Sequence, residues 1–238
     1  MAKENISQFY DDFSERQTKI GVNERLISLF KRMKKQGLSS RSKILELGCG
    51  VGAFTYLLSK KINTGLVEAI DLSEKSIERA QKYVQKKNIL FSVGDVVSYT
   101  PQNSDFDFIT LLDVIEHIPL EEHAYLFQNI SKIATEQTLI VINIPNPDYI
   151  NYLHQHNPEG LQVIDQAIEL PLLAENLDKN HLEIVFFEKY GIWEKEDYHF
   201  ILVRKKREFK LKHLADERSI FQKIGFRLRL KSDKIKFS

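Results

Sequence analysis

The feature that most constrains this chain is a loop in which three glycines, Gly48, Gly50 and Gly52, alternate with other residues. An apolar run, residues 43–47, leads into the loop, and residues 54–60 after it have helical spacing. Glycine adopts positive φ without strain and lets a ligand approach the backbone closely. The start of a helix presents free N–H groups. This order predicts a ligand site at the carboxyl end of the first strand of a doubly wound sheet.

Short apolar runs alternate with helical stretches along most of the chain. The runs that predict parallel strands are residues 43–47, 65–70, 89–93, 106–112 and 139–144, and the helical stretches are residues 54–60, 74–85 and 120–134. Helices then cover both faces of the sheet. Residues 182–188 and 198–203 are too close together for a crossover helix, so they predict an antiparallel hairpin. The expected fold is α/β: a doubly wound, seven-stranded, mostly parallel sheet with an antiparallel C-terminal hairpin.

The same patterns divide the chain into three parts. Residues 1–40 predict an N-terminal helical cap, residues 41–205 the sheet domain, and residues 206–238 a basic amphipathic C-terminal tail. Residues 148–180 have helical character and interrupt the alternation, which predicts a helical insert after the fifth strand. We expect the cap and the insert to fold over the carboxyl edge of the sheet as a lid.

Charge is distributed unevenly along the chain. The net charge is +1, but residues 204–238 contain 13 Lys and Arg against 4 Asp and Glu, so they carry +9 and the remainder carries −8. One interpretation is a solvated, partly disordered end; interleaved apolar residues also suit an anionic membrane surface or a partner protein. The negative remainder disfavours nucleic acid as a partner, because phosphate binding needs a positive channel beside the active site.

The cysteine count and the apolar runs indicate a compartment. A single cysteine, Cys49, excludes a disulfide scaffold and suits a reducing environment. The longest apolar runs fall short of the roughly 20 residues that span a bilayer, and residues 1–17 are too polar for a secretory signal. We therefore expect a soluble, cytoplasmic protein, with attachment of residues 204–238 to a membrane surface as a further hypothesis.

Three acidic residues near predicted strand ends bear on the choice of cofactor. The glycine pattern alone also fits a dinucleotide fingerprint, and Asp71 suits the ribose hydroxyls of either cofactor. Glu46 lies near the end of a buried strand, where a carboxylate needs a cationic or hydrogen-bonding partner. Asp95 follows the third strand and is placed to accept from an exocyclic amine such as that of adenine. Helix capping by Asp71 and turn formation by Asp95 are the structural alternatives.

Four motifs together resemble those of class I S-adenosylmethionine-dependent methyltransferases. They are Glu46-x-Gly48-x-Gly50-x-Gly52, Asp71, Gly94-Asp95-Val96 and Leu111-Leu112-Asp113-Val114-Ile115-Glu116-His117. The resemblance covers about residues 41–205, with the motifs in the family's order. It implies S-adenosyl-L-methionine as the cofactor and methyl transfer as the reaction.

Analogy within this family extends to the acceptor. Residues 113–117 are similar to the segment of quinone- and sugar-modifying members, and an insert followed by a basic tail is similar to enzymes of bacterial glycan assembly. We therefore expect O-methylation of a small molecule, a sugar, glycan or quinone-like hydroxyl. A nucleic-acid methyltransferase, a non-catalytic S-adenosylmethionine-binding module and a nicotinamide oxidoreductase are the alternatives.

The resemblance implies roles for individual residues. Glu46, Gly48 and Gly50 would line the methionine part of the cofactor. Asp71 would hold the ribose, Asp95 and the Val96 backbone the adenine, and the chain around Leu112 the amino group. The other expected cofactor contacts are Cys49, Gly52, Leu72, Asp113 and Tyr10, the last because Tyr10-Asp11 matches a pair often found in the family. Cys49 is expected to be an apolar filler, because no basic neighbour lowers its pKa.

The predicted catalytic residues are His117 and Glu116. Pro119 suits the first turn of the next helix, so residues 113–118 predict a tight connecting turn. Since these two neighbours are not expected to point the same way, we expect His117 to face the pocket as general base, because imidazole titrates near neutrality. A histidine that only orders the loop through backbone hydrogen bonds is the alternative.

Polar residues of the insert are candidate substrate contacts: His154, His156, Asn157 and Gln162. Each also fits an ordinary surface position. Two imidazoles without a nearby third ligand make a poor metal site, so no metal is expected.

Overall fold

The computed structural model describes residues 14–15, 17–161, 164–211 and 218–235. The chain divides into two compact units, with the boundary between Lys206 and Arg207. The first unit contains a sheet covered by helices, and the second contains a helix.

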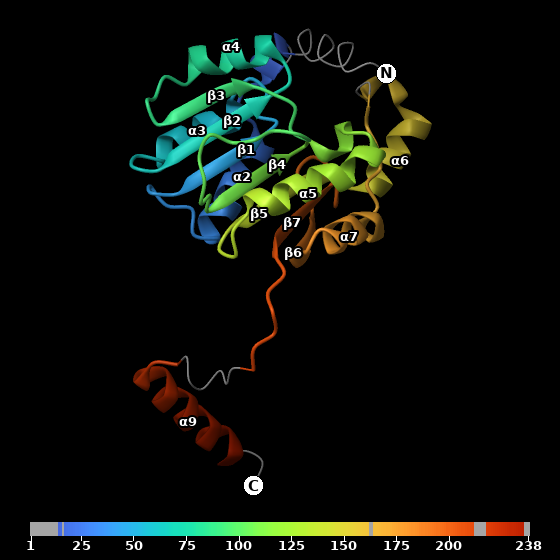
Figure 1. The fold of residues 1–238 in the computed structure, drawn as a ribbon. Coiled ribbons are helices and arrows are strands. Elements are labelled where there is room, and N and C mark those ends of the chain that lie inside the picture. Colours follow the sequence, from blue (N-terminus) through green and yellow to red (C-terminus); the bar gives the residue numbers. More distant parts are fainter. Residues whose placement is uncertain (1–13, 16, 162–163, 212–217, 236–238) are drawn as a thin grey trace. The chain divides into compact units, whose positions relative to one another are not determined.

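The first unit is built on a seven-stranded sheet with the order β3-β2-β1-β4-β5-β7-β6 (Figure 1). Its strands are β1 (Lys43–Leu47), β2 (Leu66–Asp71), β3 (Ile89–Val93), β4 (Phe108–Leu112), β5 (Leu139–Pro145), β6 (Leu182–Tyr190) and β7 (Tyr198–Lys205). The first five strands are parallel. Strand β7 is antiparallel to both of its neighbours, β5 and β6. The predicted fold class is confirmed, including the C-terminal hairpin.

Helices cover both faces of this sheet (Figure 1). The helices are α2 (Glu24–Lys35), α3 (Ala53–Lys61), α4 (Glu74–Tyr83), α5 (His123–Ile133), α6 (Pro147–His156) and α7 (Leu170–Lys179). Apolar residues of α2, α3 and α4 share one core with Ile44 of β1. Those of α5 and α7 share the other core with Leu45. Successive strand residues point to opposite faces, so one buried strand serves both cores.

Side-chain caps fix where the helices beside the sheet edge begin. The Asn23 side chain accepts a hydrogen bond from the Leu26 N–H at the start of α2, at 3.1 Å. The Ser73 hydroxyl accepts from the Ser76 N–H at the start of α4, at 3.0 Å. Ser73, and not Asp71, is therefore the residue that caps α4.

The segment after β5 carries the insert predicted at residues 148–180. It contains α6, a short 3₁₀ turn (Pro158–Gly160) and α7. Asn146 caps α6 by accepting from the Asp148 N–H at 3.1 Å, and Pro147 occupies the first helical turn. The turn predicted after β4 is a 3₁₀ helix, η1 (Ile115–His117), and a second one, η2 (Leu120–Glu122), precedes α5.

A fully buried carboxylate joins β2 to the loop after β3. Glu68 accepts hydrogen bonds from the Tyr99 hydroxyl at 2.9 Å and from the Gln102 N–H at 2.7 Å. It also accepts from the Asn103 N–H at 3.1 Å and the Asn103 side-chain amide at 2.7 Å. Four donors on two carboxylate oxygens make burial of this group tolerable.

We expect Glu68→Gln to lower the free energy of unfolding by about 1–3 kcal/mol, because the new NH₂ group meets donors and leaves them unsatisfied. Urea unfolding measures the change. Glu183→Gln, at an exposed position of β6, is the matched control and should stay within about 0.5 kcal/mol of wild type. Equal stability of the two variants would contradict a structural role for the Glu68 network.

Candidate functional site

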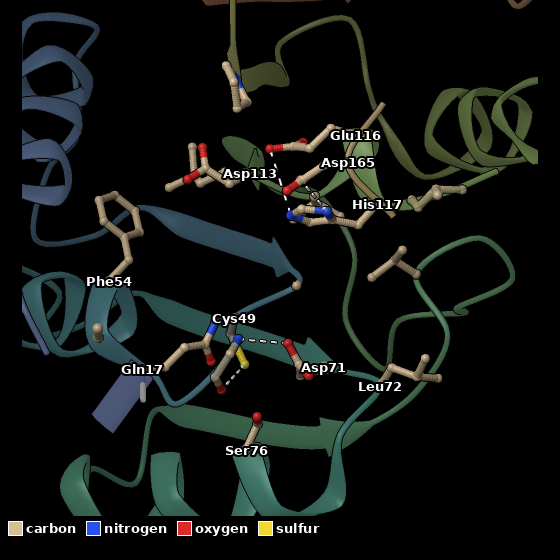
Figure 2. Close-up of a pocket in the computed structure, with 18 of the residues that line it drawn as sticks. Gln17, Cys49, Phe54, Asp71, Leu72, Ser76, Asp113, Glu116, His117 and Asp165 are labelled. Atoms are coloured by element: carbon tan, nitrogen blue, oxygen red, sulfur yellow. Dashed lines mark hydrogen bonds and ion pairs between the residues drawn. The ribbon is translucent and has the colours of Figure 1, made fainter. Parts of the chain in front are cut away.

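A cavity of about 440 Å³ opens where β1, β2 and β4 end. Figure 2 shows Cys49 and Asp71 at one end of it and Asp113, Glu116, His117 and Asp165 at the other. Most residues predicted for the site line this cavity: Glu46, Gly48, Cys49, Gly50, Asp71, Leu72, Asp95, Val96, Leu112, Asp113, Glu116 and His117. These predicted residues, which lie far apart in the sequence, therefore line one cavity.

Three backbone N–H groups connect the glycine loop to the end of β2. The N–H groups of Gly48 and Cys49 donate to the Ile70 carbonyl, at 2.9 and 2.8 Å. The Gly50 N–H donates to Asp71 Oδ2 at 2.7 Å (Figure 2). Gly48 and Gly50 have φ angles of 75° and 52°, which residues with a side chain rarely adopt. Asp71 thus shapes the loop as well as lining the cavity.

Two of the loop glycines are also required by close packing. A Cβ at Gly48 would lie 2.5 Å from Val114 Cγ2, in the segment after β4. A Cβ at Gly52 would lie 2.8 Å from the Cβ of Ala80 in α4. Gly52 is not among the lining residues, which corrects its predicted role as a cofactor contact. Its absent side chain instead lets the start of α3 pack closely against α4.

Glu46 lies beneath the loop on β1 and is only 3% exposed. Its Oε2 accepts a hydrogen bond from the Thr55 hydroxyl of α3 at 2.8 Å. Burial raises the pKa of Glu46 to about 8; the Thr55 hydrogen bond lowers the pKa and the nearby Asp71 charge raises it. The hydrogen-bonding partner that the sequence requires is therefore Thr55.

Cys49 behaves as a buried apolar residue. Burial raises the pKa of its thiol well above the ordinary value, and the charges of Asp71 and Glu46 act in the same direction. A thiol that resists ionisation is a poor nucleophile. This environment supports the interpretation of Cys49 as a filler within the loop.

Asp95 lines the cavity and also forms a turn. Its Oδ1 accepts a hydrogen bond from the Val97 N–H at 3.0 Å, and its carbonyl accepts from the Ser98 N–H at 3.2 Å. These bonds hold the chain as it leaves β3. Asp95 therefore forms the turn that the structural alternative predicts, and it also lines the cavity.

Asp113 ends β4 in a left-handed conformation, with φ of 56°. The Asn143 side chain of β5 donates to Asp113 Oδ1 at 2.9 Å, and the Tyr190 hydroxyl donates to Asn143 Oδ1 at 2.6 Å. The guanidinium of Arg25, from α2, forms an ion pair with Asp113 and donates to the Tyr198 hydroxyl at 3.4 Å. This network fixes the carboxyl end of β4 and places one cation at the cavity wall.

An imidazole between two carboxylates forms the other end of the cavity (Figure 2). His117 Nδ1 lies 2.5 Å from the Ile164 carbonyl oxygen and 3.2 Å from Asp165 Oδ1. Both partners accept hydrogen bonds, so Nδ1 carries the proton and Nε2 is the basic atom of the neutral ring. Glu116 Oε1 lies 4.0 Å from Nε2.

The cluster changes the protonation of its members. Burial by itself lowers the pKa of His117, but the Asp165 hydrogen bond and the Glu116 charge outweigh it, so the pKa is raised above the ordinary value. Burial raises the pKa of Glu116, against the opposing effect of His117. Both Glu116 oxygens are buried without a hydrogen-bonding partner among the described residues. These are the pKa changes typical of a site that handles protons.

One expectation about this turn needs correction. We expected only one of Glu116 and His117 to face the pocket, but both line it, because the 3₁₀ turn curls around the cavity end. His117 does make the backbone contact of the loop-ordering alternative, through Ile164, and it faces the cavity as well.

The predicted substrate contacts on the insert lie elsewhere. His154, His156 and Asn157 are exposed and do not line the cavity. His154 Nε2 bonds the Asp165 carbonyl at 2.8 Å, and His156 stacks on Tyr152 with ring centroids 4.2 Å apart. Gln162 and Tyr10 lie outside the described residues.

Other residues of the insert reach the cavity instead. Tyr149, Ile150 and Leu153 of α6 line it, together with Leu161 and Asp165. Tyr149, Ile150 and Leu153 lie at helical spacing on one face of α6, and apolar residues at that spacing indicate a buried face. This periodicity is the sequence signal that could have identified these three residues as part of the cavity wall. No comparable local signal identifies Asp165.

The N-terminal helical part also contributes to the cavity wall. Gln17, Asn23, Arg25 and Leu26 line it, so the expected covering of the sheet edge from this side is present. Arg25 was missed because one arginine in a helix rich in cations carries no distinguishing local signal.

The family comparison agrees with this geometry. Residues 44–137, from β1 to the turn before β5, match the family model described as "Methyltransferase domain". This segment carries the glycine loop, Asp71, Asp95 and the Glu116–His117 turn. Residues 44–137 are therefore similar in sequence to methyltransferase domains.

Curated relatives match this chain over part of their length. The ribosomal protein L11 methyltransferase of Thermotoga neapolitana is 28% identical over 109 residues, which are 46% of this chain and 39% of that protein. The demethylmenaquinone methyltransferase of Staphylococcus aureus is 29% identical over 118 residues, 49% of this chain and 48% of that protein. The chain thus matches less than half the length of each.

Solved structures are similar to this chain in fold over a larger share of its length. The magnesium protoporphyrin IX methyltransferase of Synechocystis PCC 6803 with bound SAH has a TM-score of 0.67 at 17% identity and covers 86% of this chain and 99% of that one. The DhpI–SAM–HEP complex has a TM-score of 0.65 at 16% identity, covering 84% and 96%. The fold of this chain is therefore similar to the folds of these two proteins.

Within the candidate site, we expect Asp165→Asn to lower the pKa of His117 by about one pH unit or more, because it removes the adjacent negative charge. NMR titration of the imidazole measures the pKa before and after the change. Glu159→Gln, at an exposed position of the same insert, is the control and should leave the His117 pKa as in wild type. An unaltered pKa in Asp165→Asn would show that the carboxylate does not act on the ring.

Proposed function

We propose that this protein is an S-adenosylmethionine-dependent methyltransferase that transfers a methyl group to a hydroxyl of a small-molecule acceptor. The observation that carries the proposal is one cavity that joins the glycine loop at one end to the Glu116–His117–Asp165 cluster at the other. A cofactor at the first end and an acceptor at the second would meet inside the same enclosure.

The residues at the loop end fit this cofactor. The absent side chains of Gly48 and Gly50 leave the backbone open beside the cavity, where a Cβ at Gly50 would lie 3.0 Å from Gln17 Oε1. Asp71 is placed to accept from ribose hydroxyls, Asp95 from an adenine amine, and Glu46 to face a positive charge. S-adenosylmethionine carries such charges at its sulfonium and amino groups. The solved neighbours named above contain SAM or SAH, in agreement with this choice.

The bound cofactor supplies an activated methyl group with a good leaving group, so the protein has to orient the acceptor, exclude water and accept a proton. His117 Nε2 is the atom that would take the hydroxyl proton, since Nδ1 is occupied by Ile164 and Asp165. Glu116 stabilises the resulting imidazolium from the other side. General base catalysis of this kind contributes about 10²–10⁴ in rate.

The charge of the cavity favours an uncharged or cationic acceptor. Among the described residues, seven carboxylic acids line it against one arginine: Glu46, Asp71, Asp95, Asp113, Glu116, Glu122 and Asp165. A polyanion would meet repulsion at this wall, which speaks against nucleic acid as the substrate. Tyr149, Ile150 and Leu153 offer an apolar face with one hydroxyl, suited to a quinone-like or sugar acceptor. The relative acting on demethylmenaquinone belongs to the first of these classes.

We expect the protein to bind S-adenosylhomocysteine, and Asp71→Asn to weaken this binding at least tenfold. The amide cannot accept from ribose hydroxyls as a charged carboxylate does, and it loosens the Gly50 N–H contact. Isothermal calorimetry with S-adenosylhomocysteine and with NAD measures both points. Glu78→Gln, on α4, is the charge-matched control. Absence of S-adenosylhomocysteine binding by folded wild-type protein would sink the proposal.

We expect His117→Ala to reduce turnover at least tenfold with S-adenosylhomocysteine affinity nearly unchanged, because the imidazole lies at the acceptor end. In wild type, turnover should rise with pH through a midpoint above 6.5, since the base must be neutral and its pKa is raised. Methyl release in a screen of hydroxylated acceptors, followed by a pH profile on the best one, measures both. Wild-type turnover in the variant would reject His117 as the base.

A further inference from the structure

The second unit contains an amphipathic helix that the methyltransferase site does not use. This helix, α9 (Ile220–Ile235), is the one regular element among the described residues of that unit. A capping box specifies its start: the Ser219 N–H donates to Gln222 Oε1 at 2.8 Å, and the Gln222 N–H donates to Ser219 Oγ at 3.3 Å. The helix is therefore encoded by its own sequence.

Apolar side chains form a stripe along α9. Ile220, Ile224 and Leu228 follow one another at intervals of four residues. Phe221 lies on the same face of the helix, three residues before Ile224 and seven before Leu228. All four are exposed, Phe221 to 86% and Leu228 to 64%. Exposed apolar residues that are grouped in this way indicate an interaction surface, in contrast to single ones scattered over a protein.

Cationic residues are also frequent in α9. α9 contains five of them against one acid, Asp233: Lys223, Arg227, Arg229, Lys231 and Lys234. Residues 204–238 as a whole carry +9. An apolar stripe within a cationic helix matches a surface that is negatively charged outside and apolar beneath. Nucleic acid would use the cations and leave the stripe exposed to water, so the stripe favours a lipid surface.

We propose that α9 binds in the headgroup region of anionic lipid bilayers and attaches the enzyme to the membrane surface. Its apolar stripe would enter the acyl boundary and its cations would remain among the anionic headgroups. Sixteen residues give a length of about 24 Å along the surface. No helix among the described residues is long and apolar enough to cross a bilayer, so α9 would lie in the interface. This inference is independent of the methyl-transfer proposal.

Co-sedimentation of the full chain with vesicles tests the attachment. We expect binding to vesicles made of equal parts phosphatidylcholine and phosphatidylglycerol, at least tenfold stronger than to phosphatidylcholine alone. Raising the salt concentration should weaken it, because the headgroup attraction is screened. Equal binding to both vesicles, or no binding to either, would overturn the proposal. Binding of a random-sequence oligonucleotide without binding of anionic vesicles would assign the helix to nucleic acid instead.

Two variants with the same change of charge separate the stripe from the cations. Leu228→Glu places a carboxylate on the stripe and should reduce vesicle binding at least tenfold. Phe226→Glu places it on the opposite side of the helix, where Phe226 contacts the Arg218 guanidinium, and should reduce binding several times less. Equal losses would mean that net charge alone drives binding, and the stripe would then have no role. Circular dichroism and S-adenosylhomocysteine binding check that each variant remains folded.

Discussion

The hydrogen bonds that tie the glycine loop to the end of β2 are the constraint on which the rest of the site depends. Two N–H groups on one carbonyl and a third on Asp71 turn the chain sharply at the point where β1 ends. The turn requires positive φ at Gly48 and Gly50, which is why glycines alternate there. It also directs the first turn of α3 toward the cavity, so Thr55 comes within reach of the Glu46 carboxylate. The shape of the glycine loop, the direction of α3 and the hydrogen bond to Glu46 therefore all depend on this one junction.

Because Glu46 is buried beneath this junction, the protonation of its carboxyl group depends on whether a charged ligand lies in the cavity. In the protein alone its pKa is raised to about 8, so the group is largely neutral at pH 7 and the cost of burying a charge is avoided. A positively charged ligand beside it would favour the carboxylate and lower that pKa. Binding of such a ligand would then release a proton, and its affinity would increase with pH up to the pKa of the empty site.

The sequence predicted what depends on short-range pattern. Strand periodicity predicted all seven strands. Because parallel strands share one carboxyl edge, it also predicted that Glu46, Asp71 and Asp95 lie close together, and all three line the cavity. Contacts between distant segments left no such pattern. Arg25 reaches Asp113 from 88 positions away, and Asp165 reaches His117 across the whole of β5 and α6. His154 and His156 were chosen for their chemistry alone, and they do not line the cavity because the face of α6 that is turned inward carries Tyr149, Ile150 and Leu153.

The position of Asp165 gives the insert a part in the chemistry as well as in covering the site. Residues 164–166 bind the η1 turn at several points: Ile164 and Asp165 hold the imidazole, and the Gln166 N–H donates to the Glu116 carbonyl at 3.0 Å. The Gln166 side chain adds a bond to the Ile118 carbonyl at 2.6 Å. The same insert supplies the apolar wall formed by α6. Under the proposed function, a substitution in this segment that alters contacts with the acceptor would also alter the tautomer and basicity of His117, so acceptor binding and proton transfer would be coupled.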